Sequence, residues 1–297
     1  MKHVSVLLQE VIEGLDLKPT DIVLDGTANG GGHSEALAKL IPKGILVACD
    51  ADVTALARAR TRLAEYAHVK FWETNFRHVP ERLKEEGIEG VDKLLLDLGL
   101  SSNQLEESGR GFTFQKDEPL EMTFKATPGE ETLTARDIVN TWSEETLTTI
   151  FRGFGEEKFP GRIARAIVEA RSIKPIERTG ELAEIVRMAI PKFARKGKIH
   201  PATRVFQALR MATNDELGAL KTILEAIPTI LRPGGRVAII TFHSIEDRMV
   251  KDAFRALTQS NPSFTLLHKK PIVPTDLEIS TNPRARSAKL RIITKTI

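Results

Sequence analysis

The stretch Asp21-Ile-Val-Leu-Asp-Gly-Thr-Ala-Asn-Gly-Gly-Gly-His33 decides the fold of this chain. It is a short apolar run, closed by an acid, that leads into a glycine-rich turn, and apolar residues at helical spacing follow over 34–40. Three more apolar runs come at 44–50, 69–73 and 94–97, with helical patterns between them. Continuous apolar runs separated by helices indicate a parallel sheet that is buried on both faces. We therefore predict a doubly wound α/β fold.

The next comparable run, 237–242, comes far downstream, whereas a normal crossover needs only a few dozen residues. The intervening sequence looks helical, with one long helical run from 201 to 231. We therefore predict a core of residues 1–104 and 211–297, interrupted by an inserted helical domain of residues 105–210. Residues 152–210 hold fourteen Lys and Arg against six acids, so positive charge is concentrated there.

Composition excludes several classes of protein. The 297 residues carry 43 Lys and Arg against 40 Asp and Glu, a net charge of +3, and 41% are hydrophobic. No apolar stretch approaches the roughly 18 residues of a membrane span, and the first residues do not look like a signal peptide. Cys49 is the single cysteine, so an intramolecular disulfide and a cysteine-rich zinc site are excluded. We expect a cytoplasmic protein without a membrane anchor.

The glycine turn is a candidate nucleoside site. Its spacing is neither the dinucleotide Gly-x-Gly-x-x-Gly nor a phosphate-binding P-loop. An acid directly before the first glycine would repel phosphate but suits a cationic group, and S-adenosylmethionine carries an ammonium and a sulfonium without any phosphate. Asp50 ends the second run, where such folds place an acid on ribose hydroxyls. Phe76, after the third run, either covers an adenine ring or packs in the core.

The loop after the fourth run is a candidate catalytic segment. It carries a carboxylate, two hydroxyls and two amides close together, and a strand-end loop of that polarity is more often functional than structural. Either serine alternatively caps the following turn. The residues are Asp97, Ser101, Ser102, Asn103 and Gln104.

Three further segments are candidate substrate contacts. His243 follows the fifth run and either lines the pocket or is a core histidine, while Ser244 and Asp247 have the spacing of a helix start. Arg204, Gln207 and Arg210 share one helix face, which is either a solvated charged face or a surface that contacts RNA. Two more arginines, Arg284 and Arg286, precede a final strand at 290–294. The histidines show no metal-ligand spacing, so we predict no metal.

A set of motifs along the whole chain resembles the MraW (RsmH) family of S-adenosylmethionine-dependent methyltransferases. The motifs are Asp25-Gly-Thr-x-x-Gly-Gly-Gly-His-Ser34, Leu95-Leu-Asp-Leu-Gly-x-Ser-Ser102, Arg110-Gly-Phe-x-Phe114, Gly155-Glu-Glu157, Arg162-Ile-Ala-Arg-Ala-Ile167, His200-Pro-Ala-Thr-Arg204, Phe242-His-Ser-x-Glu-Asp-Arg248 and Asn282-Pro-Arg-Ala-Arg-Ser287. The chain departs from the family pattern at Glu121-Met-Thr-Phe-Lys125, where an arginine and a second acid are missing.

The resemblance implies a class I methyltransferase core with an inserted helical domain. It implies N4-methylation of a cytidine in the decoding centre of 16S ribosomal RNA, near the P site of the small subunit. It also implies that part of the candidate set contacts the cofactor. These residues are Gly31, Gly32, His33, Asp50, Phe76, Asp97 and Gln104, and Asp25 and Gly30 join them from the turn itself.

N4-methylation needs in-line attack by the exocyclic amine and no covalent intermediate. We expect Asp97 to organise the mouth of the site and Ser101, Ser102 and Asn103 to orient the base, which is unpaired or flipped out to be reached. We expect Arg204, Gln207, Arg210, His243, Arg284 and Arg286 to contact RNA. The alternatives are a methyltransferase for another RNA or a small amine, an NAD-dependent oxidoreductase, and a non-catalytic ribosome-assembly factor. We expect a monomer or a homodimer.

Overall fold

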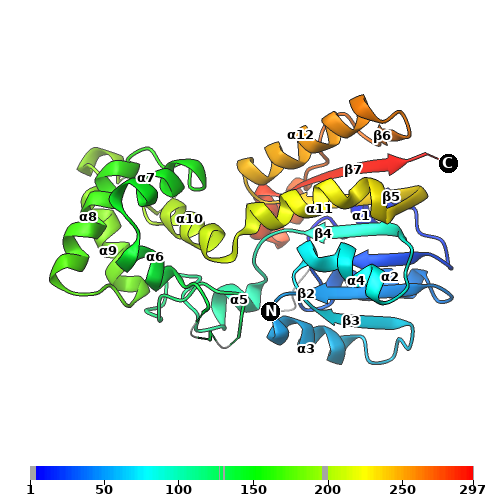
Figure 1. Cartoon of the computed structure of the whole chain (residues 1–297), viewed down its shortest axis with the longest axis horizontal. Coiled ribbons are helices and arrows are strands. Elements are labelled where there is room, and N and C mark those ends of the chain that lie inside the picture. The colour runs from blue at the N-terminus through cyan, green and yellow to red at the C-terminus, as the bar shows by residue number, and fades with distance from the viewer. Residues whose placement is uncertain (1–4, 127, 130, 196–199, 297) are drawn as a thin grey trace. The chain divides into compact units, whose positions relative to one another are not determined.

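The computed structural model describes residues 5–126, 128–129, 131–195 and 200–296. The chain forms two compact units, Met1–Gly99 with Leu217–Ile297, and Leu100–Glu216 (Figure 1). These boundaries lie a few residues outside the expected insertion 105–210. The reason is packing: Leu100 and Leu105 contact the core of the second unit, and Arg210 forms an ion pair with Glu216.

The first unit contains a seven-stranded sheet in the order β3-β2-β1-β4-β5-β7-β6. The first five strands in that order run parallel, β7 is antiparallel to β5, and β6 is antiparallel to β7. This confirms the doubly wound α/β prediction. The strands are β1 Ile22–Asp25, β2 Ile45–Asp50, β3 Val69–Glu73, β4 Val91–Asp97, β5 Leu231–Thr241, β6 Phe264–Leu266 and β7 Lys289–Lys295.

Helices cover both faces of this sheet (Figure 1). Alternate residues of one strand point to opposite faces, so Leu94 and Leu96 of β4 join one apolar core and Leu95 joins the other. The helices of this unit are α1 Leu8–Leu15, α2 Gly32–Leu40, α3 Val53–Arg62, α4 Val79–Glu85, α11 Glu216–Ile230, α12 Ser244–Ser260 and α13 Asp276–Thr281, with 3-10 turns at Phe76–His78 and Pro283–Ser287. Burial on both faces explains why the strands are continuously apolar in sequence.

The second unit is helical and has its own apolar core around Phe151, which is fully buried. Its helices are α5 Ser102–Glu106, α6 Ala135–Thr141, α7 Glu144–Gly153, α8 Pro160–Ile173, α9 Thr179–Ala189 and α10 Thr203–Asn214, with a 3-10 turn at Lys192–Ala194. The long helix expected over 201–231 is wrong. Asp215 adopts a left-handed conformation (φ 45°), which ends α10 before α11 begins.

The segment that departs from the family pattern is held firmly inside the second unit. Met122 is fully buried, and the Arg110 guanidinium donates to the carbonyl oxygens of Thr123 and Phe124 at 3.2 and 2.8 Å. The Asn214 amide donates to the Met122 carbonyl at 2.7 Å. Backbone oxygens are the acceptors in these bonds, so this part of the anchoring does not depend on which side chains the segment carries.

Candidate functional site

Three neighbouring strands of the sheet each end in an aspartate. Asp25 ends β1, Asp50 ends β2 and Asp97 ends β4, and the sheet order β2-β1-β4 brings the three strand ends together. The carboxyl edge of a parallel sheet is where such folds bind ligands. Asp25 and Asp50 are buried, and the Asp97 side chain is 15% exposed. The edge is therefore acidic and largely dry.

Asp50 uses one carboxylate oxygen toward the glycine turn and the other toward the start of α3. They accept hydrogen bonds from the backbone N–H of Asp52 at 2.8 Å and of Asn29 at 2.7 Å. Burial nevertheless raises the pKa of Asp50 to about 7, because the charged form loses its hydration and these two bonds offset only part of the loss. Hydroxyl donors from a ribose would favour the ionised form further, which agrees with the predicted role of Asp50 toward a nucleoside.

The glycine turn leaves open space at one position. A Cβ at Gly30 would have no protein atom within 4 Å, whereas a Cβ at Gly32 would lie 2.3 Å from the Ser5 hydroxyl oxygen. Gly31 has φ +79°, a left-handed conformation that favours glycine, and it directly precedes the first residue of α2. Gly30 therefore faces space that a ligand is able to fill, while Gly31 and Gly32 are required by the fold of the turn.

Asp25 holds this turn from inside the protein. Its carboxylate accepts hydrogen bonds from the Ser34 hydroxyl at 2.6 Å and from the Thr27 backbone N–H at 3.2 Å. Burial, partly offset by the Ser34 bond, raises the pKa of Asp25. The Thr27 hydroxyl in turn accepts a hydrogen bond from the Asp97 backbone N–H at 2.6 Å, which joins the ends of β1 and β4. Neither Thr27 nor the Ser34 hydroxyl stands out in the sequence as a site residue, because their partners, Asp97 and Asp25, are met only in the folded chain.

His33 lies between the N-terminal segment and Asp97. Its Nε2 is 3.0 Å from the Val6 carbonyl oxygen, and its Nδ1 is 3.4 Å from Asp97 Oδ2. The other oxygen, Asp97 Oδ1, is buried and has no hydrogen-bond partner among the residues that the structure describes. An unpartnered buried carboxylate oxygen at a ligand-binding edge indicates a position where a bound group supplies the missing donor or positive charge.

The remaining predicted cofactor contacts differ in character. Phe76 is partly buried and packs against the core beside Gly26, at the carboxyl edge of the sheet. Gln104 accepts a hydrogen bond from the Ser101 backbone N–H at 2.9 Å, and Ser101 Oγ accepts one from the Gln104 N–H at 3.2 Å. Ser101 and Gln104 therefore form a capping box at the start of α5, which confirms the capping alternative for Ser101.

His243, rather than Ser244, is the residue that caps α12. His243 Nδ1 accepts a hydrogen bond from the Glu246 backbone N–H at 3.3 Å, and Glu246 Oε2 accepts one from the Phe242 N–H at 3.0 Å. Asp247, expected to cap with Ser244, instead pairs with Arg291 and Lys289 of β7 at 2.7 and 2.9 Å. The Ser244–Asp247 prediction was wrong by one residue, because His243 is the N-cap and its ring accepts from the Glu246 N–H, while the Asp247 N–H donates to the His243 carbonyl.

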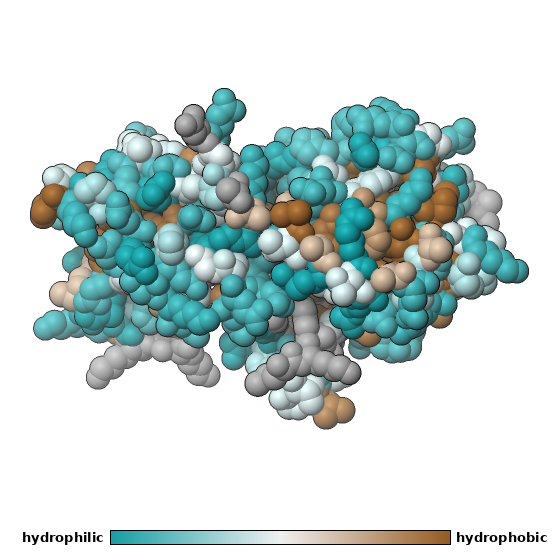
Figure 2. All heavy atoms as spheres, turned by 90° about the horizontal axis from the view of Figure 1, so that it is seen from below, coloured by the Kyte–Doolittle hydropathy of each residue, from teal (hydrophilic) through white to brown (hydrophobic). Residues whose placement is uncertain are grey.

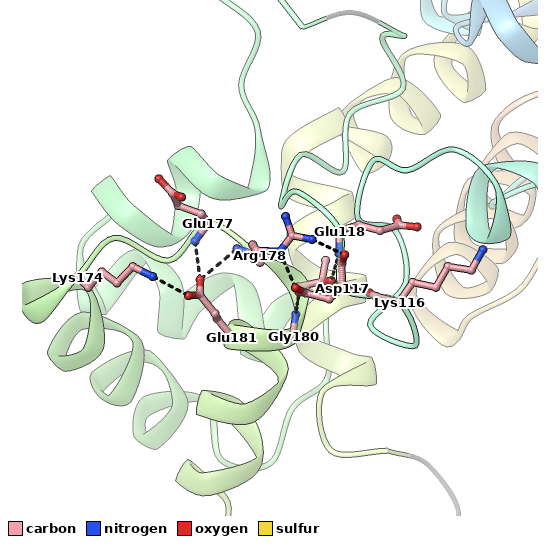
Figure 3. A network of polar contacts seen from close by, with 9 residues as sticks. Lys116, Asp117, Glu118, Lys174, Glu177, Arg178, Gly180 and Glu181 are labelled. Atoms are coloured by element: carbon pink, nitrogen blue, oxygen red, sulfur yellow. Dashed lines mark hydrogen bonds and ion pairs between the residues drawn. The ribbon is translucent and has the colours of Figure 1, made fainter.

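Many cations of the second unit are already paired. Arg178 pairs with Asp117 at 2.5 Å and Lys174 with Glu181 at 3.0 Å (Figure 3). Arg210 donates twice to Glu216, at 2.7 and 2.8 Å, and the Gln207 amide donates to the Phe154 carbonyl at 3.1 Å. Two of the three residues of the predicted RNA-contacting helix face thus hold the unit together.

A smaller set of cations remains without an acidic partner in the described part of the second unit. Gln207 bonds to Phe154, and Gly155 approaches the Arg204 carbonyl so closely that a Cβ there would be 2.6 Å away, so the α7–α8 turn lies against the start of α10. We call the cations on these elements the α7–α8–α10 basic cluster. Its members are Arg152, Lys158, Arg162 and Arg204. In the first unit, Arg286 is exposed and Arg284 is half-buried.

The site fits S-adenosylmethionine and offers nothing typical of a metal. Open space at Gly30, the buried Asp50 carboxyl and the unpartnered Asp97 Oδ1 match a cationic nucleoside without phosphate. Within the described ranges, no group of three His, Cys, Asp or Glu is placed to hold a metal ion. None of the helices described has the length and apolar character that crossing a membrane requires.

A further hollow of about 490 Å³ lies along β3, and its lining includes Glu73 and Thr74, which are next to Asp50 at the end of β2. It is lined by Phe71 and Trp72, with Arg60 above the Phe71 ring and Arg82 near the Trp72 ring. Figure 2, which views the molecule from below, shows apolar surface between hydrophilic side chains on this unit. Its lining mixes both charge signs, so its size alone does not make it the site.

The fold and this edge define a class I, S-adenosylmethionine-dependent methyltransferase. The sequence pattern of the MraW methylase family matches residues 1–296, and the chain belongs to that family. It is 43% identical to the ribosomal RNA small subunit methyltransferase H of Clostridioides difficile over 99% of this chain and 98% of the relative. It is 47% identical to the protein of the same name from Desulforapulum autotrophicum, over 98% of each.

A more distant likeness links the chain to solved structures. A SAM-dependent O-methyltransferase from Thermotoga maritima is 11% identical, with a TM-score of 0.42, and the match covers 100% of this chain and 69% of that one. At that distance the likeness assigns no residue.

We predict that Gly30→Val removes donor binding without disturbing the fold. Nothing lies within 4 Å of a Cβ at this position, so the new side chain fills space that the donor needs. Calorimetric titration with S-adenosylhomocysteine is expected to show affinity lowered about tenfold or more, equivalent to about 1.4 kcal/mol. The Tm of the ligand-free variant should match that of the wild type. Wild-type affinity in the variant would show that the ligand does not lie against this turn.

We also predict that Asp50 makes the ligand-free protein less stable as pH rises. The folded carboxyl, with its pKa of about 7, keeps a proton that the unfolded chain has released above its ordinary pKa, about 3.9. The contribution of Asp50 to the free energy of unfolding therefore falls between those two values and is constant above them. Urea unfolding from pH 5 to 8 should give a flatter pH dependence for Asp50→Ala than for the wild type. Identical slopes would contradict this account.

Proposed function

We propose that this methyltransferase transfers a methyl group to N4 of a cytidine in the decoding centre of 16S ribosomal RNA, near the P site. The observation that carries the proposal is the full-length identity of 43–47% to relatives named ribosomal RNA small subunit methyltransferase H. The choice of N4 and of the decoding centre rests on the family resemblance of the motifs.

The chemistry of the site is consistent with attack by an amine. Bound S-adenosylmethionine supplies an electrophilic methyl group on a sulfonium. Methylation of a ring carbon of cytosine would call for a cysteine nucleophile, and Cys49 is fully buried and donates to the Thr74 carbonyl at 3.1 Å. Burial raises the pKa of the Cys49 thiol well above its ordinary value, so the thiolate is strongly disfavoured. Direct transfer to an exocyclic amine needs no such nucleophile.

We assign the protein's contribution chiefly to positioning and electrostatics. Asp50 binds hydroxyl donors of the nucleoside, and the glycine turn allows its close approach. Asp97 Oδ1 is available to accept a hydrogen bond from a bound group or to lie beside a positive charge. Cytosine N4 is a weak nucleophile because its lone pair is delocalised into the ring, so an acceptor for an N4–H helps to localise that pair. Correct placement of the reactants then accounts for most of the rate.

The polar residues after β4 are proposed to orient the base. Their existing hydrogen bonds decide which of their atoms are available to do so. Ser101 uses its oxygen as an acceptor for α5 and keeps its hydroxyl proton for another partner. The Asn103 amide nitrogen donates to Glu107 at 2.7 Å, which leaves Oδ1 as its free acceptor. Ser102 is the first residue of α5.

For RNA recognition we propose the α7–α8–α10 basic cluster in place of the full Arg204, Gln207 and Arg210 face. Cations without an acidic partner are free to neutralise phosphates, whereas Arg210 is held by Glu216. Arg284, Arg286 and His243 remain proposed RNA contacts of the first unit, although His243 also caps α12. Binding through phosphates implies that affinity falls as salt rises.

The proposed function is tested by a transfer assay with tritiated S-adenosylmethionine on small ribosomal subunits that lack the endogenous modification. The expected product, after digestion to nucleosides, is labelled N4-methylcytidine. Label in another nucleoside, or in a small amine with no label in RNA, would overturn the proposal. Donor binding without any transfer to RNA or subunits would also count against it.

We predict that Arg162→Gln and Arg204→Gln raise the KM for the ribosomal substrate several-fold and leave the affinity for the donor unchanged. Each variant loses one phosphate contact, so the slope of log affinity against log salt should become shallower by about 1. Arg187→Gln is the matched control, because this exposed helical arginine of the same unit is already paired with Glu184 at 2.6 Å. Equal effects in all three variants would show that the unpaired cations have no special role.

A further inference from the structure

His33 has one ring nitrogen whose proton is fixed by its surroundings. Nε2 lies 3.0 Å from the carbonyl oxygen of Val6, and a carbonyl oxygen only accepts hydrogen bonds. Nε2 must therefore carry a proton. In a neutral ring this leaves Nδ1 as a bare lone pair, and Nδ1 is the atom that faces Asp97 Oδ2 at 3.4 Å. A lone pair facing a carboxylate is repulsive, so this contact requires a proton between Nδ1 and Oδ2, carried by the ring or by the carboxyl group.

The Val6 carbonyl is held in place from several sides. The Leu7 backbone N–H donates to Glu278 Oε1 at 2.8 Å, and Leu7 is fully buried in a left-handed conformation with φ 53°. Ser5 lies directly against Gly32, where no Cβ would fit. The segment is thus anchored to both α13 and the glycine turn, so it cannot readily swing away to let the His33 ring reverse its contacts.

The charged groups around His33 come from three elements. Asp97 of β4 and Asp25 of β1 are both acidic, and Arg62 of α3 approaches the turn at Gly32 but is paired with Glu35 at 2.6 Å. Burial alone would lower the pKa of His33, and the hydrogen bond and charge of Asp97 together with the charge of Asp25 outweigh it, so the pKa is raised above its ordinary value of 6.5.

We propose that His33 is a positioning residue of the donor site, held as an imidazolium between the Val6 carbonyl and Asp97. Its Nδ1–H fixes one carboxylate oxygen of Asp97, and the other, Oδ1, is left directed to the bound groups. The inference rests on the proposed role of Asp97 in the site. A histidine is therefore needed directly after the three glycines. The Val6 carbonyl keeps Nε2 protonated, and the proton on Nδ1 binds the Asp97 carboxylate.

The first test is a titration of the ligand-free protein, labelled with 15N-histidine, followed by NMR. We expect both ring nitrogens of His33 to be protonated at pH 7, and Asp97→Asn to move the His33 titration to lower pH. His68 is the internal control, because its Nε2 also contacts a carbonyl, that of Ala38 at 3.1 Å, and it has no carboxylate contact like that of His33 with Asp97 among the described residues. A His33 ring that is neutral at pH 7, or one whose titration ignores Asp97→Asn, would overturn the proposal.

Two substitutions separate the contact with Asp97 from the contact with Val6. In His33→Asn the amide nitrogen takes the place of Nδ1 and donates to Asp97, whereas in His33→Gln it takes the place of Nε2 and donates to Val6. Calorimetry with S-adenosylhomocysteine at pH 7 should show near wild-type affinity for His33→Asn and affinity about tenfold lower for His33→Gln. The reverse order would mean that His33 serves only to hold the N-terminal segment.

The pH dependence of binding gives an independent check. Wild-type affinity for the donor product should fall as pH rises through the His33 titration, because Nδ1 then loses the proton that faces Asp97. His33→Asn should not show this fall, since its amide does not titrate. None of these measurements uses RNA. Failure to methylate ribosomal subunits would therefore overturn the proposed function and leave the role of His33 unaffected. A neutral His33 ring at pH 7 would overturn the role of His33 and leave the proposed function unaffected.

Discussion

The burial of three carboxylates at adjacent strand ends is the constraint on which the rest of the site depends. Removing a carboxylate from water is costly unless donors or positive charge replace the water. Asp25 is compensated by Ser34 and Thr27, and Asp50 by the backbone N–H groups of Asn29 in the glycine turn and of Asp52 at the start of α3. Asp97 has one oxygen facing His33 and the other unpartnered in the described chain. That second oxygen is the position where a bound ligand is able to supply a donor or positive charge.

The same constraint explains the shape of the glycine turn. The backbone curls so that the Asn29 N–H reaches Asp50, with Asn29 itself left-handed at φ 49°, and Gly31 at φ +79° then leads the chain into α2. The turn also starts α2, whose second residue is His33. One short segment thus donates a hydrogen bond to the buried Asp50, leaves space for a nucleoside at Gly30 and places the His33 ring against Asp97.

Much of the architecture was predictable because it depends on local patterns. Runs buried on both faces are continuously apolar, so the strands and the parallel sheet could be inferred, as could the acids that end them. The partner that each polar side chain takes was not predictable. Arg210 pairs with Glu216 instead of facing RNA, His243 takes the cap expected of Ser244, and the Val6 carbonyl fixes His33. In each case the role of the side chain depends on where its partner lies in the folded protein. Composition and residue spacing do not give that position.

Asp50 is the most direct probe of whether the acidic strand ends form the donor site. Calorimetric titration of S-adenosylhomocysteine into the wild type and Asp50→Ala, at pH 8 where the Asp50 carboxyl is ionised, makes the test. We expect affinity lowered about tenfold or more in a variant that still unfolds cooperatively, the loss expected for hydrogen bonds to a charged group. Equal affinity in the two proteins would contradict it.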